Sequence, residues 1–287
     1  MMPVEKSDYP TNVESGNSGS AESDEDDNTL MVDFVGQCPS EEDKDGISKF
    51  LVELFPGNKV DLDQLAAEIG KNSYIGSVFK MHSNAEEDQE MEDGLEALSD
   101  DFLFGVVSAF ELTPEGEETK PSVSQVIDFL IAKCNSSKAS NSTKKSCIEL
   151  LKSCDRLFFL VNERIETMPP KIAALALKAL LKDLANFEFN NIVMVAKLVQ
   201  TEVKGRSKSS AKASAASSDE ESYLFAEERQ FDLHSQLRFD YEHDGGSEGE
   251  KAIEMEGGGK AFNRVVFMEK DEFIAAVNEI IQLYNPE

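Results

Sequence analysis

Carboxylates are by far the most numerous side chains in this sequence that could do chemistry. The 287 residues include 56 Asp and Glu, and many of them stand in runs, at residues 22–27, 85–101 and 219–221. A catalytic pair of carboxylates needs two desolvated and unequal environments, so that one keeps its proton and the other loses it. Solvated runs do not provide such environments. They favour a negatively charged surface that receives a cationic partner, although runs that are only solvated segments would have the same pattern.

The other reactive residue types are not spaced for catalysis or metal binding. Histidines and cysteines share no metal-ligand spacing, no C-x-x-C motif occurs, and no histidine-based triad is visible. Neither common phosphate-binding glycine motif is present, and Gly257–Lys260 precede a strand instead of a helix. The sequence therefore predicts no catalytic residue, no cofactor and no metal. We expect surface positions for His82, His234 and His243, and small core residues at Cys147 and Cys154.

The charge balance limits the class of partner. With 28 Lys and Arg against 56 Asp and Glu, the formal net charge is −28 at pH 7, and the sequence pI is about 4.4. Such a chain repels nucleic acid phosphates and anionic lipid surfaces, so we expect no direct nucleic acid binding and no membrane insertion. Basic proteins are the partners that this charge would attract. No apolar stretch reaches the roughly 20 residues of a transmembrane helix. Because neither a secretory signal nor a disulfide framework is visible, we expect a soluble intracellular protein.

The apolar pattern predicts a single mixed α/β domain in which helices flank a sheet. Residues 1–28 are expected to form a disordered acidic tail, and residues 29–287 a domain with flexible loops at about 82–99, 205–220 and 244–259. Helices are predicted after Ser40, Asp61 and Pro121, from about 144 to 154, over 172–184 and at the C-terminus. Strands are predicted at 30–35, 74–79, 102–112, 157–161, 192–199, 237–241 and 265–268.

Local signals also assign some helix ends and faces. Ser40 is expected to cap the first helix, which stops at Pro56-Gly57. The second helix has Asp61 and Gln64 in capping-box spacing and is expected to end at Gly70. Residues 135–143 are loop-like. The helix at 172–184 is apolar on nearly every face, so we expect it to be central.

The candidate partner-binding residues are the acidic runs and one strand. Apolar and polar residues alternate from Leu237 to Tyr241, so this strand should be half buried and could present a client surface, although its polar face could equally be ordinary solvated surface. Three serines each have an acidic residue three positions on, a pattern typical of substrates of acidophilic, casein-kinase-two-type kinases but common in any acidic tail. The predicted binding residues are Glu22, Asp24, Glu25, Asp26, Asp27, Asp219, Glu220, Glu221, Leu237, Phe239 and Tyr241, and the predicted phosphosites are Ser23, Ser40 and Ser218.

A set of short strings also occurs in a fixed order from about residue 30 to the C-terminal helix. The strings are Val32-Asp33-Phe34, Asp45-Gly46-Ile47, Ile75-Gly76-Ser77-Val78, Phe104-Gly105, Asn162-Glu163-Arg164 leading to Pro169-Pro170, and Phe225-Ala226-Glu227-Glu228 before Leu237-Arg238-Phe239. In this order and spacing the chain resembles the BCCIP family, whose yeast members are called Bcp proteins.

The resemblance implies a fold similar to that of the Gcn-five-related N-acetyltransferases and a nuclear protein, with possible shuttling to the cytoplasm. It also implies binding instead of catalysis. In yeast, family members are chaperones and escorts for a basic large-subunit ribosomal protein and take part in nuclear export of a lipid kinase. In animals they bind a recombination protein and an inhibitor of cyclin-dependent kinases.

The acetyltransferase-like fold raises an enzyme hypothesis that the sequence opposes. Enzymes of that class hold the coenzyme A pyrophosphate on backbone N–H groups of a glycine-rich loop at a helix start. Here the matching segment is Glu166–Lys171, where two prolines lack an N–H and no glycine allows close backbone approach. Three hypotheses therefore compete: an acidic chaperone, a scaffold for cell-cycle and recombination proteins, and an acyltransferase with an unusual cofactor loop.

Overall fold

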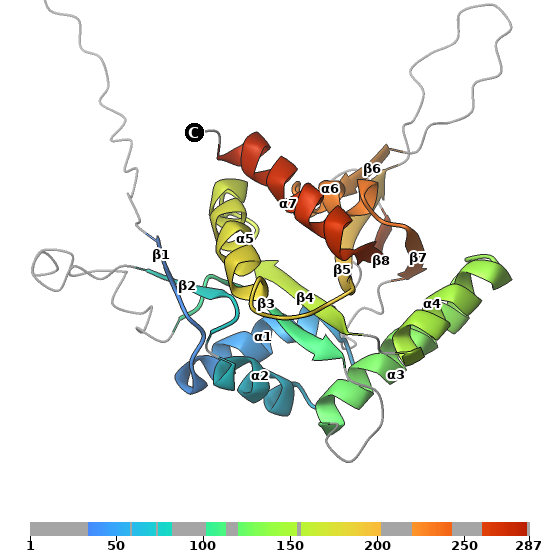
Figure 1. Ribbon diagram of the computed structural model, residues 1–287, viewed down its shortest axis with the longest axis horizontal. Coiled ribbons are helices and arrows are strands. Elements are labelled where there is room, and N and C mark those ends of the chain that lie inside the picture. The colour runs from blue at the N-terminus through green and yellow to red at the C-terminus, as the bar shows by residue number, and fades with distance from the viewer. Residues whose placement is uncertain are drawn as a thin grey trace, which may run out of the picture. The chain divides into compact units, whose positions relative to one another are not determined.

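The computed structural model describes residues 34–57, 59–72, 74–81, 102–112, 120–153, 156–201, 220–242 and 260–285, which belong to one compact unit (Figure 1). The tail expected at 1–28 and the loops expected at 82–99 and 244–259 lie outside these residues. The loop expected at 205–220 also lies outside, except that Glu220 already belongs to a strand.

A mixed sheet of eight strands forms the centre of this unit. Seven strands follow the order β1-β2-β3-β4-β5-β8-β7, and β6 pairs with β5 beside this path. Among the strand pairs of the described residues, β4 and β5 run parallel and the others antiparallel. The strands are β1 (Phe34–Gln37), β2 (Ser77–Met81), β3 (Gly105–Leu112), β4 (Leu157–Arg164), β5 (Asn191–Thr201), β6 (Glu220–Tyr223), β7 (Leu237–Glu242) and β8 (Lys260–Glu269).

Helices cover both faces of the sheet, and the predicted mixed α/β fold is confirmed (Figure 1). One face carries the short 3-10 helix η1 (Glu41–Asp43), α1 (Lys44–Leu54), α2 (Leu62–Lys71), α3 (Pro121–Ser136) and α4 (Asn141–Ser153). The other carries α5 (Pro170–Leu184), α6 (Glu228–Leu233) and α7 (Lys270–Tyr284).

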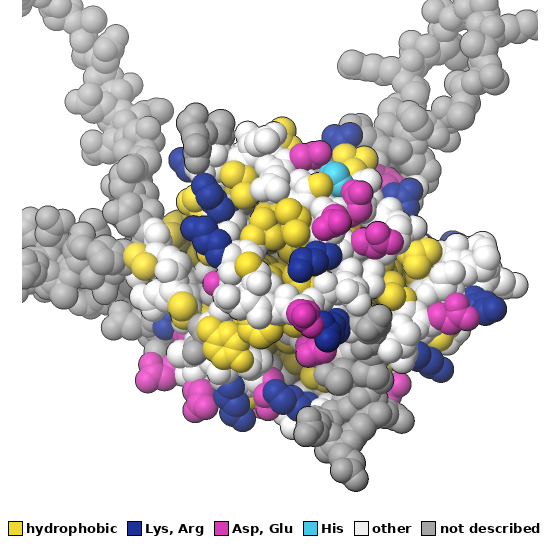
Figure 2. Space-filling view, in the orientation of Figure 1, with side chains coloured by type: hydrophobic (Ala, Val, Ile, Leu, Met, Phe, Trp, Pro, Cys, Tyr) yellow, Lys and Arg dark blue, Asp and Glu magenta, His cyan; other side chains and the backbone are white. Residues whose placement is uncertain are grey.

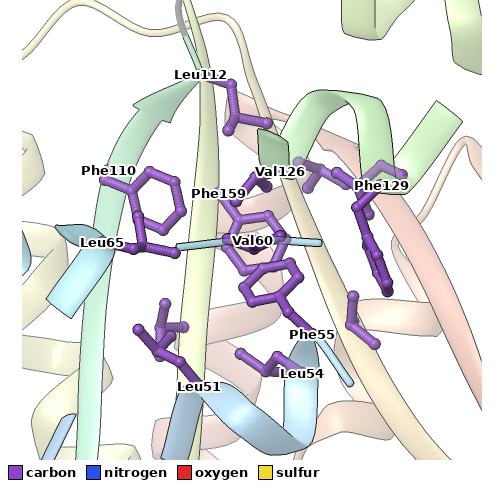
Figure 3. Close-up of a cluster of buried hydrophobic side chains, with 14 of the residues drawn as sticks. Leu51, Leu54, Phe55, Val60, Leu65, Phe110, Leu112, Val126, Phe129 and Phe159 are labelled. Atoms are coloured by element: carbon purple, nitrogen blue, oxygen red, sulfur yellow. The ribbon is translucent and has the colours of Figure 1, made fainter. Parts of the chain in front are cut away.

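Each face of the sheet has its own hydrophobic cluster, and β4 contributes to both. Phe159 and Val161 point toward α1–α4, whereas Phe158 and Leu160 point toward α5–α7. Successive side chains of a strand point to opposite faces, so a strand covered on both sides must be apolar throughout. Figure 3 shows part of the cluster beneath α1–α4, in which the ring centres of Phe55 and Phe159 are 5.4 Å apart. Burying each such side chain stabilises the fold by about 1.5–3 kcal/mol.

The helix starts follow the predicted capping residues. Ser40 has extended backbone, and its hydroxyl and amide both donate to the Asp43 carboxylate at 2.8 Å. Asp61 caps α2 by accepting the Gln64 amide at 3.0 Å. Gly70 lies inside α2 instead of ending it, which corrects the prediction. A Cβ at this glycine would overlap the Ser40 carbonyl, so the residue allows η1 and α2 to approach closely.

Three further expectations need correction. Residues 135–143 form the end of α3 and the start of α4, with a short turn at 137–140. The helix α6 was not predicted, because it is only one and a half turns long. Helix α5 packs on one face of the sheet and is not apolar all round, since Lys171 and Lys182 are exposed along its outer side. Figure 2 shows Lys and Arg side chains over this part of the surface.

Candidate functional site

The parallel strands β4 and β5 separate soon after they pair. They are in register only over Leu157–Leu160 and Asn191–Met194, although β4 continues to Arg164 and β5 to Thr201. The chain following β6 enters the space between them. There the Leu224 amide donates to the Lys197 carbonyl at 2.8 Å, and the Lys197 amide donates to Glu228 Oε2 at 3.4 Å. The opening between the two strands is therefore filled by residues 224–228, which we call the plug.

A buried ion pair fixes the plug to β4. The guanidinium of Arg164 donates to both carboxylate oxygens of Glu227, with 2.9 Å between Nη2 and Oε2. The same guanidinium lies 4.1 Å from the centre of the Phe225 ring, and its Nε donates to the Met168 carbonyl at 3.4 Å. Both charged side chains are nearly inaccessible to solvent, at 3% and 0% exposure. A bidentate pair with these additional contacts offsets the cost of desolvating two ions.

Four more polar residues complete this cluster. Lys197 Nζ binds Glu163 Oε2 at 2.6 Å, and the Asn162 amide nitrogen lies 3.2 Å from Glu227 and 3.3 Å from Glu228. Burial raises the pKa of Glu163, although Lys197 opposes this. Burial, followed by the neighbouring charges of Glu227 and Glu163, raises the pKa of Glu228 well above its usual range. The cluster holds three carboxyls and two cations, so a protonated Glu228 leaves it neutral.

The arrangement supports a structural role for these carboxyls. Glu163, Glu227 and Glu228 are at most 2% exposed, so a substrate cannot touch them in this conformation. Their position could have been suspected from sequence, because the string Asn162-Glu163-Arg164 continues an apolar strand. Charged residues inside a buried strand require partners from elsewhere in the chain. The sequence could not show that these partners are Lys197, Glu227 and Glu228.

The entry to α5 does not fit the pyrophosphate of coenzyme A. Strand β4 leads through a turn at Ile165–Met168 to Pro169 and Pro170, which begin the helix. Neither proline has an N–H, and the Ile172 amide already donates to the Pro169 carbonyl at 3.0 Å. Two of the N–H groups that could hold a pyrophosphate at this helix start are thus missing, and a third is already used.

Comparisons with known proteins agree with these observations. The family model described as BCCIP matches residues 29–231. The chain belongs to the BCCIP family. A Drosophila melanogaster protein BCCIP homolog is 27% identical over 61% of this chain and 60% of its own length. The Bos taurus BRCA2 and CDKN1A-interacting protein is 29% identical over 74% of this chain and 69% of its own. The crystal structure of BCP1 from Saccharomyces cerevisiae covers 92% of this chain and 97% of its own, with a TM-score of 0.54 and 15% identity, which shows the shared fold.

Most of the acidic residues that were predicted to bind partners lie outside the described part of this BCCIP-family chain. Glu22, Asp24, Glu25, Asp26, Asp27 and Asp219 lie outside the described residues, as do Ser23 and Ser218. Glu220 begins β6, and Glu221 is half exposed there. Glu221 accepts from Arg264 at 3.0 Å, so part of its charge is neutralised within the fold.

The strand at 237–241 has the predicted alternation but a different consequence for binding. Phe239 and Tyr241 are only 3% and 5% exposed, and Leu237 packs against the same cluster beneath α3 and α4. Phe239 and Tyr241 are core residues, so they cannot provide the partner surface predicted for them, whereas Leu237 is partly buried. The opposite side of β7 presents Arg238, Asp240 and Glu242.

An ion-pair network beside β7 was missed by the sequence analysis. Arg264 on β8 is buried, and its guanidinium donates to Asp240 at 2.8 Å and to Asp232 at 2.9 Å. Although burial would raise the pKa of Asp232, hydrogen bonds from Tyr223 and Arg238 and the Arg264 charge hold it below its usual range. The network joins α6 to β6, β7 and β8, and its residues are too far apart in sequence for any local pattern to reveal it.

The predicted phosphosite at Ser40 has a structural role. Its hydroxyl is held by Asp43, whose other carboxylate oxygen is bound by Lys80 at 2.7 Å. A phosphate there would stand against a buried carboxylate. Ser40 therefore serves as a cap, and the kinase hypothesis remains a prediction for the other two serines.

The remaining candidates are the possible metal ligands, the cysteines and the histidines. Across the described ranges, no group of three or more His, Cys, Asp and Glu side chains could hold a metal ion. Cys134 and Cys147 are buried free thiols, and burial raises the pKa of Cys147 to about 12. His234 is partly buried between Glu272 and Glu279, contrary to the expected exposed position. Within the same residues, no helix is long and apolar enough to cross a membrane.

Proposed function

We propose that this protein is a non-catalytic acidic binding protein that captures basic protein clients. The observation that carries the proposal is the net charge of −28, which attracts cationic partners over long range and speeds their encounter. The plug adds support, because it fills the opening between β4 and β5 with the chain's own side chains. Acyl transfer is a much weaker candidate, since Pro169 and Pro170 at the entry to α5 have no N–H to donate.

The client we propose is a basic large-subunit ribosomal protein, escorted in the nucleus and toward the cytoplasm. A free ribosomal protein of this kind would bind RNA or aggregate. Covering its cationic surface with carboxylates lowers both risks. The BCCIP family membership supports this choice through the role of the yeast relatives described above.

Rate measurements on a purified large-subunit ribosomal protein would test this mechanism. Neutralising Glu22, Asp24, Glu25, Asp26 and Asp27 should slow association and flatten its salt dependence, with little effect on dissociation in high salt. Steering charges act at a distance that salt shortens to about 8 Å at physiological ionic strength. If neutralisation changes only dissociation, at every salt concentration, the tail is a contact site and the steering mechanism is wrong.

A second candidate function is a scaffold for cell-cycle and recombination proteins. The bovine and human relatives are both called BRCA2 and CDKN1A-interacting protein, which favours this reading. Affinity purification in moderate salt, with mass spectrometry of the bound proteins, separates the candidates. Recovery of ribosomal proteins supports the chaperone, whereas recovery of recombination or cell-cycle proteins alone supports the scaffold. Saturable acetyl-CoA binding would instead favour an acyltransferase.

A further inference from the structure

A groove of about 260 Å³ opens where α2, the start of α3 and the adjoining ends of β3 and β4 meet. Buried Phe110 and Phe158 line it together with Tyr74 and Phe187, and its charged lining residues are Glu68, Glu111 and Lys120. We call it the aromatic groove and define it by Tyr74, Phe110, Phe158, Phe187, Glu68 and Glu111.

Tyr74 is unusually exposed for an aromatic residue on a folded surface. Its side chain is 60% accessible, and its ring is nearly parallel to that of Phe187, with 5.8 Å between the ring centres. Phe187 is supported in turn by Phe158, with 6.3 Å between their ring centres. An aromatic ring that is held from one side and open on the other can accept a further planar or cationic group.

The turn that carries Tyr74 is held firmly. The Ile75 amide donates to the Asn72 carbonyl at 2.9 Å, and the Ser108 hydroxyl donates to the Ile75 carbonyl at 2.8 Å. The next residue, Gly76, has φ +99 and donates its amide to Asp183 on α5 at 3.0 Å. A Cβ at Gly76 would overlap β3, so the turn lies directly on the sheet. Tyr74 is therefore presented by a rigid support, which lowers the entropy cost of binding.

The charges at the groove favour a cation. Glu68 is paired with Lys120 and lies 3.7 Å from Lys71. Glu111 is exposed, and none of the described residues forms an ion pair with it. A cation entering the groove thus meets one uncompensated carboxylate beside an open aromatic ring.

We propose that the aromatic groove binds an arginine side chain of the basic client and contributes specificity on the folded body. This inference rests on the proposed function, because it names where the client is held. A guanidinium can stack on the Tyr74 ring and donate two parallel hydrogen bonds to a carboxylate such as Glu111. A lysine ammonium has the same charge but neither the planar face nor the forked donors, so arginine should be preferred.

Two peptides of equal length and charge, one rich in arginine and one rich in lysine, test the proposal. The full chain should bind the arginine peptide more tightly, by at most about thirtyfold, which is the upper limit of a cation–π contact that lysine makes only in part. Tyr74→Ala should abolish that preference, and Tyr74→Phe should keep it because the ring remains. Glu111→Gln should weaken binding of both peptides and reduce the preference for arginine.

The controls separate this inference from the proposed function. Neutralising the acidic residues 22–27 should weaken both peptides equally and leave the arginine preference unchanged. The proposal that the aromatic groove binds arginine would be overturned by equal affinities for the two peptides in the wild-type chain, or by a preference for arginine that survives in Tyr74→Ala. Either result would leave the proposed capture of basic clients by acidic charge intact. Failure of both peptides to bind in low salt would overturn both. Urea unfolding of the Tyr74 and Glu111 variants should match the wild type, because these two side chains are exposed.

Discussion

Replacing Glu227 by Gln tests whether the ion pair between the plug and β4 holds the two diverging strands together. The change keeps the shape of the side chain and one acceptor oxygen but removes its charge. Arg164 would then remain buried against a neutral amide, with its guanidinium still stacked on Phe225. The expected result is a large loss of folding free energy together with local opening of the plug.

The magnitude follows from the burial of the pair. The side chains of Glu227 and Arg164 are 0% and 3% exposed. Removing one partner from such a buried pair costs about 3–5 kcal/mol, and we expect the lower end because Gln keeps one hydrogen bond. The free energy of unfolding falls by about 1–3 kcal/mol for each molar of urea, so a loss of about 3 kcal/mol in that free energy lowers the midpoint of urea unfolding by about 1–3 M.

Urea unfolding followed by circular dichroism measures this shift, and Arg238→Gln provides a matched control. Arg238 pairs with Asp232 at 2.8 Å, but its side chain is 56% exposed. Asp232 is buried but keeps its ion pair with Arg264, so loss of the largely exposed Arg238 should cost only about 1 kcal/mol. Hydrogen exchange adds a local readout, because the Leu224 amide that bonds to Lys197 should lose protection in Glu227→Gln only.

A double variant, Arg164→Met with Glu227→Leu, completes the experiment. Because it removes both charges and leaves none unpaired, it should recover part of the stability that Glu227→Gln loses. The reasoning is refuted if Glu227→Gln lowers the urea midpoint no more than Arg238→Gln and leaves the Leu224 amide protected.

The remaining predictions concern four single positions. Because burial raises the folded-state pKa of Glu228, ionised Glu228 destabilises the fold, and stability declines as pH rises above the pKa that this glutamate has in the unfolded chain. Glu228→Gln should remove this decline and stabilise the protein at neutral pH, as unfolding measured over a pH series would show. The hydrogen bond to Glu272 and then the contact with Glu279 raise the pKa of His234, so the stability that His234 contributes is fully present below about pH 6.5 and is lost as pH rises through the folded-state pKa. His234→Gln should therefore lower the free energy of unfolding by at most about 1 kcal/mol near pH 6 and by little at pH 9. Gly70→Ala should destabilise by about 1–3 kcal/mol in thermal unfolding, since overlap with the Ser40 carbonyl outweighs the gain of about 1 kcal/mol in helix propensity. Ser40→Ala should cost about 1 kcal/mol through the lost cap, and Ser40→Glu should cost more; equal stability of Ser40→Glu and wild type would reopen this position as a phosphosite.

The sequence by itself determined the features that depend on neighbouring residues. The capping of η1 by Ser40 and of α2 by Asp61, and the proline at the start of α5, involve residues within a few positions of each other. The strands at 157–161 and 192–199 were predictable because an element buried on both faces is apolar throughout. The acidic charge, and the class of partner that it attracts, also require no structure.

Tertiary structure alone decided which distant residues meet. The Arg164–Glu227 pair joins residues 63 positions apart, and Arg264 reaches Asp232 across 32. The burial of Phe239 and Tyr241 also depended on the tertiary structure. Alternation along a strand shows that one of its faces is buried, but it does not show which elements cover that face. Tyr74 and Phe187 come together only because α5 returns the chain to the edge of the sheet near Gly76. Such contacts depend on how crossovers bring elements together, and a single sequence carries local periodicity but no record of that geometry.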